Sequence, residues 1–129
     1  MLLGTYYPNL IRKGRLALPK KIRNELGGKR IVLTIGSEEC VFGFREKDWD
    51  EAIKPELSRP LFSDKEGRKL RRKMCAAAII VELDSQGRFI IPENMMKYAK
   101  INENLVLIGA GDHFEIWDSE KWQEYSKKI

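Results

Sequence analysis

Hydrophobic residues along this 129-residue chain follow two spacings. Short runs of alternating or continuous apolar residues, bounded by turn residues, predict β-strands. Apolar residues that recur every three or four positions predict helices instead. The strands are expected at residues 2–10, 15–18, 30–36, 40–45, 78–83, 88–91, 104–109 and 113–117. The helices are expected from Pro19 to Gly27, at 47–53, from about Asp64 to 76, at 92–100 and after Asp118.

Proline, glycine and aspartate set the expected ends of these helices. Pro19 suits a first helical position, because its missing N–H would have no partner there. Gly27 follows an inward-facing pair, Ile22 and Leu26, and is expected to end that helix. Asp118 is a favourable N-cap for the last helix. Turns are expected before Arg15 and before Arg88, and Gly14 is expected to supply the positive φ that a tight hairpin needs.

The chain repeats itself after 73 residues without a gap. The matched positions carry the same residue at several places: Leu10 and Leu83, Gly14 and Gly87, Arg15 and Arg88, Pro19 and Pro92, Ile35 and Ile108, Gly36 and Gly109, Trp49 and Trp122. A repeat that cannot bury its apolar face alone buries it against its copy. The pattern therefore predicts one pseudo-symmetric, mostly β domain over 1–129, with repeat one at 1–53, a linking helix at 55–76 and repeat two at 77–129.

The linking segment has no counterpart in the second copy. Pro55 and Pro60 are expected to break the chain, and Ser63 with Glu66 forms a capping-box pattern for the helix that follows. The basic residues of that helix, between residues 68 and 73, allow three interpretations: a solvated face, a contact with an acidic patch of another subunit, or a DNA contact.

Charge divides unevenly between the two copies. Residues 1–73 carry 18 Lys and Arg against 10 Asp and Glu, whereas residues 74–129 carry 6 against 9. Cations crowd the first turn and the helix after it, and such clustering is typical of nucleic-acid binding. The candidate DNA-binding residues are Arg12, Lys13, Arg15, Lys20, Lys21 and Arg23, with Arg88 in the second copy.

A structural interpretation stands beside the functional one for both turn arginines. Arg15 has no acidic residue close to it in the sequence before Glu25, which favours a contact with phosphate or a base edge. Arg88 lies among Asp84, Glu82 and Glu93, which favours an ion pair or a subunit contact.

The remaining chemistry argues against an enzyme. The single histidine, His113, has no second histidine or cysteine at metal spacing, and Cys40 and Cys75 are far apart. No phosphate-binding glycine loop, acid–base pair or nucleophile constellation is present in the sequence. We expect no cofactor, no small-molecule substrate and no membrane association, since no apolar stretch approaches about 20 residues. The composition is that of a cytosolic protein with reduced thiols.

Three features of the sequence resemble the MraZ family over almost the whole chain. They are the Gly-Arg turn found in both copies, the opening Met1-Leu2-Leu3-Gly4-Thr5-Tyr6 and the ending Phe114-Glu115-Ile116-Trp117-Asp118. The resemblance implies the swapped-hairpin barrel of AbrB-like regulators, carried twice. It also implies a bacterial, DNA-binding transcriptional regulator of cell-division and cell-wall gene clusters that assembles into rings. The chain departs at Ile11, where the family motif has Asp. The first turn then needs another restraint, such as packing of Ile11.

The expected function is sequence-specific binding of double-stranded DNA by a homo-oligomer, a ring on the family pattern. The basic turn and helix would make the contacts, and the protein would be cytoplasmic and nucleoid-associated. The alternative is an antitoxin-like protein-interaction module. In that case the acidic second half would bind a partner protein.

Overall fold

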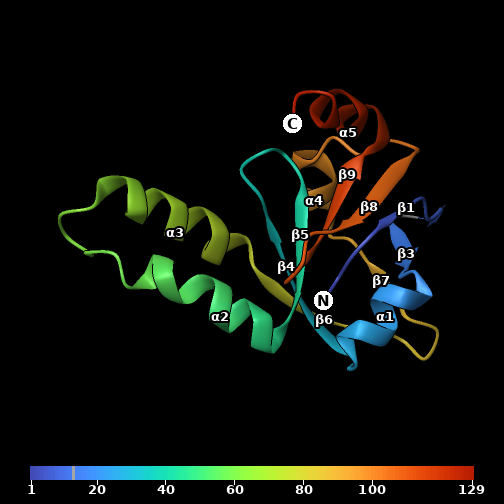
Figure 1. The fold of residues 1–129 in the computed structure, drawn as a ribbon, viewed down its shortest axis with the longest axis horizontal. Coiled ribbons are helices and arrows are strands. Elements are labelled where there is room, and N and C mark those ends of the chain that lie inside the picture. Colours follow the sequence, from blue (N-terminus) through green and yellow to red (C-terminus); the bar gives the residue numbers. More distant parts are fainter. Residues whose placement is uncertain (13) are drawn as a thin grey trace.

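The computed structural model describes residues 1–12 and 14–129 (Figure 1). Its strands are short and pair antiparallel: β1 Thr5–Tyr6, β2 Leu10–Ile11, β3 Arg15–Ala17, β4 Arg30–Ile35, β5 Val41–Arg45, β6 Ile79–Glu82, β7 Arg88–Ile90, β8 Leu105–Gly109 and β9 Phe114–Asp118. The helices are α1 Lys20–Leu26, α2 Glu46–Leu57, α3 Lys65–Ala77, α4 Glu93–Tyr98 and α5 Ser119–Ser126. None of the described helices is long and apolar enough to cross a membrane.

The strands form two sheets, and both sheets mix the two copies. One sheet has the order β1-β8-β9-β5-β4-β6 and the other has the order β2-β3-β7. The antiparallel sheets and short helices that the sequence predicts are therefore confirmed. Pairings among the described strands give open sheets rather than a closed barrel, so the swapped-hairpin barrel stays a prediction.

A pseudo-twofold relation connects the copies at the small sheet. Leu16 of β3 pairs with Phe89 of β7, its own counterpart in the repeat. The Leu18 N–H donates to the Gly87 carbonyl at 3.0 Å, and the Ile91 N–H donates to the Gly14 carbonyl at 3.0 Å. These two hydrogen bonds are exchanged when one copy is mapped onto the other. Each glycine turn is thus held by a strand end of the opposite copy.

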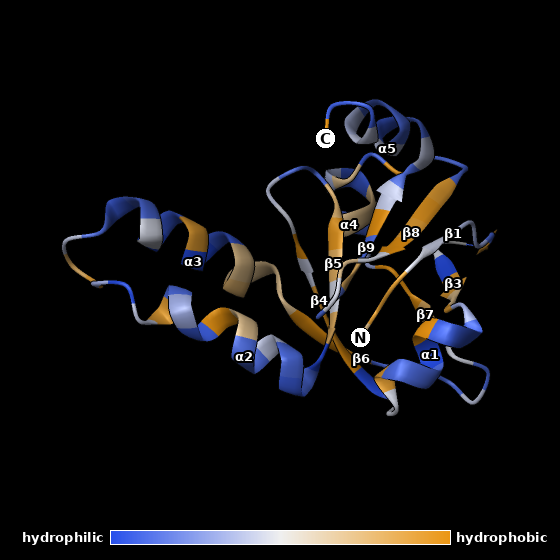
Figure 2. Cartoon of the chain, viewed as in Figure 1, coloured by the Kyte–Doolittle hydropathy of each residue, from blue (hydrophilic) through white to orange (hydrophobic). Residues whose placement is uncertain are grey.

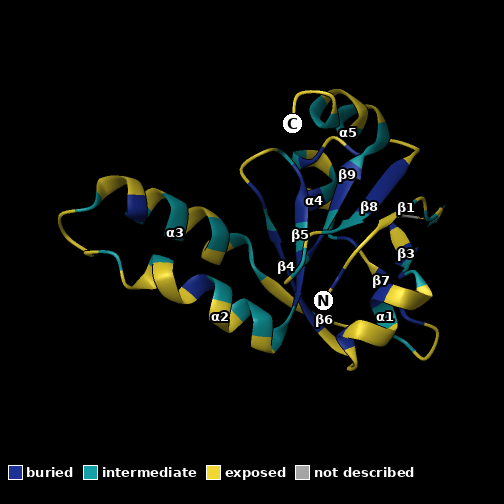
Figure 3. Cartoon of the chain, in the orientation of Figure 1, coloured by how far each residue is buried: buried dark blue, intermediate teal, exposed yellow. Residues whose placement is uncertain are grey.

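The main core lies between the sheets and helices and is built from both copies. Leu16, Leu33, Phe114 and Ile116 are each fully buried. Figure 2 shows many apolar residues on the strands, and Figure 3 shows β4, β5, β8 and β9 largely buried, whereas β6 and much of the helix surface are exposed. Burial of aliphatic and aromatic side chains is the dominant stabilising contribution. A second cluster packs Trp117 against α5, where Trp122 and Tyr125 lie against its ring.

The N-terminal segment differs from the single strand predicted at residues 2–10. Leu2 bridges to Gly111, β1 pairs with β8, and only then does β2 pair with β3. The segment therefore leaves one sheet and joins the other. Pro8 lies in the gap, where its missing N–H removes no ladder hydrogen bond.

Two helix boundaries differ from the prediction in the linking segment. Pro55 does not break the chain: it lies in the last turn of α2, which continues to Leu57. α3 is capped by Asp64 rather than Ser63, since the Asp64 carboxylate accepts the Gly67 N–H at 2.8 Å. The two helices form a hairpin that projects from the sheets (Figure 1).

Candidate nucleic-acid interface

The first basic turn joins β2 to β3. Leu10 pairs with Leu16 and Ile11 pairs with Arg15, and the Arg15 N–H donates to the Arg12 carbonyl at 2.9 Å. Gly14 has a φ of +80°, which confirms the positive φ predicted there. This conformation is open to glycine at little cost. Lys13, a predicted site residue, lies outside the described residues.

Four of the predicted cations are exposed on this turn and on α1: Arg12, Arg15, Lys20 and Lys21. Among the described residues, none of the four takes part in an ion pair or a side-chain hydrogen bond. Their positive charge is therefore not neutralised within the described part of the chain, and a polyanion could neutralise it.

Arg23 is placed differently from its neighbours. Its Nη2 donates to the Ser85 carbonyl at 2.6 Å, and its side chain is half-buried. A Cβ added at Gly87 would lie 2.7 Å from the Arg23 Cδ, so the absence of a side chain at Gly87 makes room for the arginine. Arg23 consequently ties α1 of the first copy to the turn of the second copy.

The second turn is organised by Asp84. Its carboxylate accepts the backbone N–H groups of Gln86 at 2.8 Å and Arg88 at 2.9 Å, and the Arg88 Nε at 2.7 Å. The hydrogen bond from the Arg88 backbone, followed by the bonds from the Arg88 side chain and the Gln86 backbone, lowers the pKa of Asp84 to about 2. Arg88 thus makes the ion pair that its acidic neighbours suggested.

The first turn lacks this carboxylate, because Ile11 occupies the position equivalent to Asp84. Ile11 is 43% exposed, so packing of its side chain is not what holds the turn. The backbone bonds from Arg15 to Arg12 and from Ile91 to Gly14 restrain it instead. Arg15 therefore projects without a tether, whereas Arg88 is tethered.

The small sheet brings the two turn arginines to one face. Arg15 pairs with Ile90 and Arg88 pairs with Ala17, and directly paired residues project to the same side of a sheet. The intervening pair, Leu16 and Phe89, points to the buried side. The arginines of both copies thus share an outward face, although they are 73 positions apart in the sequence.

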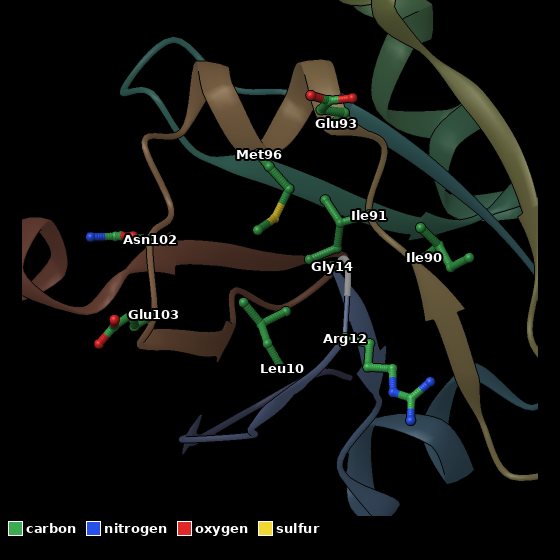
Figure 4. Close-up of a pocket in the computed structure, with 9 residues that line it drawn as sticks. All are labelled: Leu10, Arg12, Gly14, Ile90, Ile91, Glu93, Met96, Asn102 and Glu103. Atoms are coloured by element: carbon green, nitrogen blue, oxygen red, sulfur yellow. The ribbon is translucent and has the colours of Figure 1, made fainter.

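A pocket of about 860 Å³ opens beside the first turn (Figure 4). Leu10, Ile91 and Met96 contribute apolar surface, while Glu93 and Glu103 supply carboxylates. Because its walls come from both copies and from the loop after α4, no local sequence pattern marked it.

The basic helix α3 lies on the projecting hairpin, and part of its charge has a structural role. Arg68 Nη1 donates to the carbonyls of Leu61 at 3.1 Å and Phe62 at 2.7 Å. Arg71 Nη2 donates to the Leu57 carbonyl at 3.1 Å. These cations hold the loop between the helices, a role that the sequence pattern did not indicate.

His113 is bound by two acids. Its Nδ1 lies 2.8 Å from an Asp112 oxygen and its Nε2 lies 2.8 Å from a Glu115 oxygen, while Phe42 and Phe44 pack on the ring. Burial alone would lower the pKa of His113, but the hydrogen bonds to Glu115 and Asp112 outweigh it and raise the pKa. Among the described residues, no group of three or more His, Cys, Asp or Glu side chains could hold a metal ion.

The raised pKa of His113 makes stability depend on pH. A folded-state pKa above the unfolded value of about 6.5 stabilises the protein fully below that pH. The stabilisation is lost as pH rises through the folded pKa. We expect the thermal midpoint to fall as pH rises from the unfolded pKa through the raised folded pKa of His113, and to fall less in His113→Gln. Thermal unfolding followed by circular dichroism measures both, and parallel profiles would contradict this role.

Comparison with known proteins bears on this interface. A model of the MraZ family, described as "MraZ protein, putative antitoxin-like", matches the chain over residues 1–73 and again over 74–129. Proteins called transcriptional regulator MraZ from Oenococcus oeni and Thermoanaerobacter pseudethanolicus are each 39% identical over 126 residues, covering 98% of this chain and 87% of the relative. The same values hold for the protein of that name from Thermoanaerobacter strain X514.

Proposed function

Because the chain belongs to the MraZ family, we propose that it is a bacterial transcriptional regulator that binds specific double-stranded DNA sequences, in a cell-division and cell-wall gene cluster. Regulators of this kind have no catalytic step, and the proposal includes no enzyme activity, cofactor, small-molecule substrate or membrane contact. We propose that the protein acts at the nucleoid in the cytoplasm.

The observation that carries this proposal is the set of exposed cations on the first turn and α1. Arg12, Arg15, Lys20 and Lys21 are exposed, and in the described part of the chain no acid pairs with them. Arginine and lysine contacts to phosphate supply most of the affinity of a DNA-binding protein. Arginines that reach base edges then select the site. Arg15, with Arg88 on the same sheet face, is suited to that second role.

Arg23 has a supporting role in this proposal. Its bond to the Ser85 carbonyl fixes α1 against the second turn, which holds the two DNA-facing segments in one orientation. The exchanged bonds at Gly14 and Gly87 act in the same way, and they support the swapped-hairpin arrangement that we propose for the fold.

We further propose that copies of this chain associate through the helical hairpin. Phe62 at the hairpin tip is 91% exposed and Leu61 is 48% exposed. The loop that carries them is nevertheless held in place by hydrogen bonds. Arg59 bonds Asp64 at 2.6 Å and 3.1 Å, in addition to the bonds from Arg68 described above. A fixed loop that holds a phenylalanine in water is typical of a docking element.

The partner surface that fits this tip is the pocket beside the first turn of another copy (Figure 4). It offers Leu10 and Met96 to the aromatic ring, and Glu93 and Glu103 to the cations around the tip. Arg12 and Ile90 also line this pocket, on the side away from Glu103, and in this arrangement they stay with the DNA-facing sheet. The tip projects away from its own sheets, so the contact joins different surfaces on two copies. Contacts of this kind close into rings when the rotation allows. A ring presenting several basic turns raises affinity for repeated DNA sites through effective concentration.

The test is the salt dependence of binding to the DNA upstream of the chain's own gene. Fluorescence anisotropy should give an affinity whose logarithm falls linearly with the logarithm of salt, with a slope of about −3 to −5 for each engaged chain. DNase footprinting on the same fragment should show protected repeats. No binding at low salt, or binding with no salt dependence, would refute the proposal.

A second candidate is an antitoxin-like protein-interaction module. The exposed Phe62 and the apolar pocket favour it, since both surfaces suit a protein partner. The salt experiment separates the two candidates. A DNA-binding regulator must bind the fragment with an affinity that falls as the salt concentration rises, whereas a protein-interaction module need not bind DNA.

A further inference from the structure

The outward face of the small sheet is not uniformly basic. Ile11 of β2, Arg15 of β3 and Ile90 of β7 form one row across three neighbouring strands. Ile11 is 43% exposed and Ile90 is 54% exposed, so the arginine lies between two large apolar side chains that reach the solvent. A surface that contacts phosphate alone has no use for exposed isoleucines.

The equivalent surface of the second copy has a different chemistry. Arg88 is paired with Ala17 across the sheet and is tied to Asp84 at 2.7 Å. The position of Ile11 is occupied there by Asp84, which is an anion rather than an apolar group. The two arginine sites are therefore not redundant: one is tethered and polar, and the other is untethered with apolar neighbours.

Resting on the proposed DNA binding, we infer that Ile11 and Ile90 read sequence by contacting the 5-methyl groups of thymines beside the base that Arg15 contacts. The major groove admits a β-ribbon, and the thymine methyl is the apolar group that base edges present there. A β-hairpin with cations at its turn brings β2 and β3 to that groove, because the cations hold the turn against the phosphates.

The energetics favour a methyl contact over bare exposure. Each isoleucine leaves apolar area in water when the protein is free, and burying that area against a methyl group is favourable. Arginine can meanwhile form two hydrogen bonds to the guanine edge. The row Ile11–Arg15–Ile90 thus predicts a preferred site in which a guanine is flanked by thymines.

Replacing thymine with deoxyuridine removes these methyl groups and leaves the phosphates and the hydrogen-bonding edges unchanged. The upstream fragment is prepared with thymine or with deoxyuridine, and the affinity of the full-length protein for each is measured by anisotropy at one salt concentration. We expect weaker binding to the deoxyuridine fragment, about fourfold for each methyl contact and roughly fifteenfold for two.

Protein variants connect the effect to this row. Ile11→Ala/Ile90→Ala should bind the two fragments equally well, because it has lost the apolar groups that meet the methyls. Ile80 supplies a matched control: it is 52% exposed on β6, outside the small sheet. Ile80→Ala should discriminate as the wild type does. Circular dichroism is used to check that each variant is folded. Because the replaced isoleucines are exposed, we expect the fold to be retained.

The outcomes separate the two proposals. Failure to bind either fragment at low salt overturns the proposed function itself. Equal binding of wild type to both fragments leaves DNA binding standing and overturns the thymine-methyl contact. A double variant that still discriminates, or an Ile80→Ala variant that does not, overturns the assignment to Ile11 and Ile90. Discrimination by wild type and Ile80→Ala but not by the double variant supports it.

Discussion

Arg15→Ala is expected to lower the affinity for the upstream DNA by about tenfold to a hundredfold, which corresponds to the loss of one arginine contact. The Arg15 side chain is exposed and makes no ion pair or hydrogen bond with a described residue, so we expect its removal to take away a contact to DNA and to leave the fold intact. The salt slope should also become shallower by about one if the lost contact is to a phosphate. Anisotropy titrations at several salt concentrations measure both quantities.

Arg72 provides the control for this substitution. It is also exposed, but it lies on α3 of the projecting hairpin rather than on the small sheet. Arg72→Ala removes the same charge and should change affinity by much less. Equal losses in the two variants would mean that charge alone matters and that the first turn is not the binding site. An unchanged affinity in Arg15→Ala would likewise contradict the assigned site.

Phe62→Ser is expected to abolish assembly of the protein into oligomers at micromolar concentration. Removing a central aromatic side chain from a protein interface costs roughly 2–4 kcal/mol, and every contact in a ring loses the same group. Phe62 is 91% exposed, so the monomer should keep its thermal stability. Light scattering coupled to gel filtration measures the mass, and binding to repeated DNA sites should weaken with it.

The matched control is Tyr7→Ser, which removes an aromatic side chain that is 71% exposed on the body of the protein rather than on the hairpin. That variant should retain the mass of the wild type. Glu103→Lys tests the other side of the contact by reversing a charge at the pocket. If Phe62→Ser keeps the wild-type mass, the hairpin tip is not the interface. If both aromatic variants lose it, the effect is not specific to the tip.

The asymmetry between the two copies follows from one position. Asp84 holds two backbone N–H groups and a guanidinium, while its counterpart Ile11 can hold none of them. The departure at Ile11 was evident in the sequence. Its consequence depends on the pairing of β2, β3 and β7, which places Ile90 on the other side of Arg15. Ile11, at the position where the second copy has Asp84, thus supplies part of the apolar surface beside Arg15.

The linking segment shows where local rules fail. Pro55 is compatible with α2, because it lies near the C-terminal end and the helix continues only two residues beyond it. Asp64 caps α3 because Arg59 orients its carboxylate from the preceding turn, leaving Ser63 exposed. The Asp64 cap depends on Arg59, a neighbour outside the Ser63–Glu66 window from which the helix start is predicted.

The sequence alone determined the approximate positions of the helices, the glycine turns, the repeat and the concentration of cations in the first copy. These features depend on residues a few positions apart, where backbone geometry and charge act directly. Only the tertiary structure decided that Arg15 and Arg88 share a face, that Arg23 is tied to Ser85, and that Phe62 stands exposed. These placements depend on strand pairing and loop packing between residues far apart in the chain, which the burial of a common core selects.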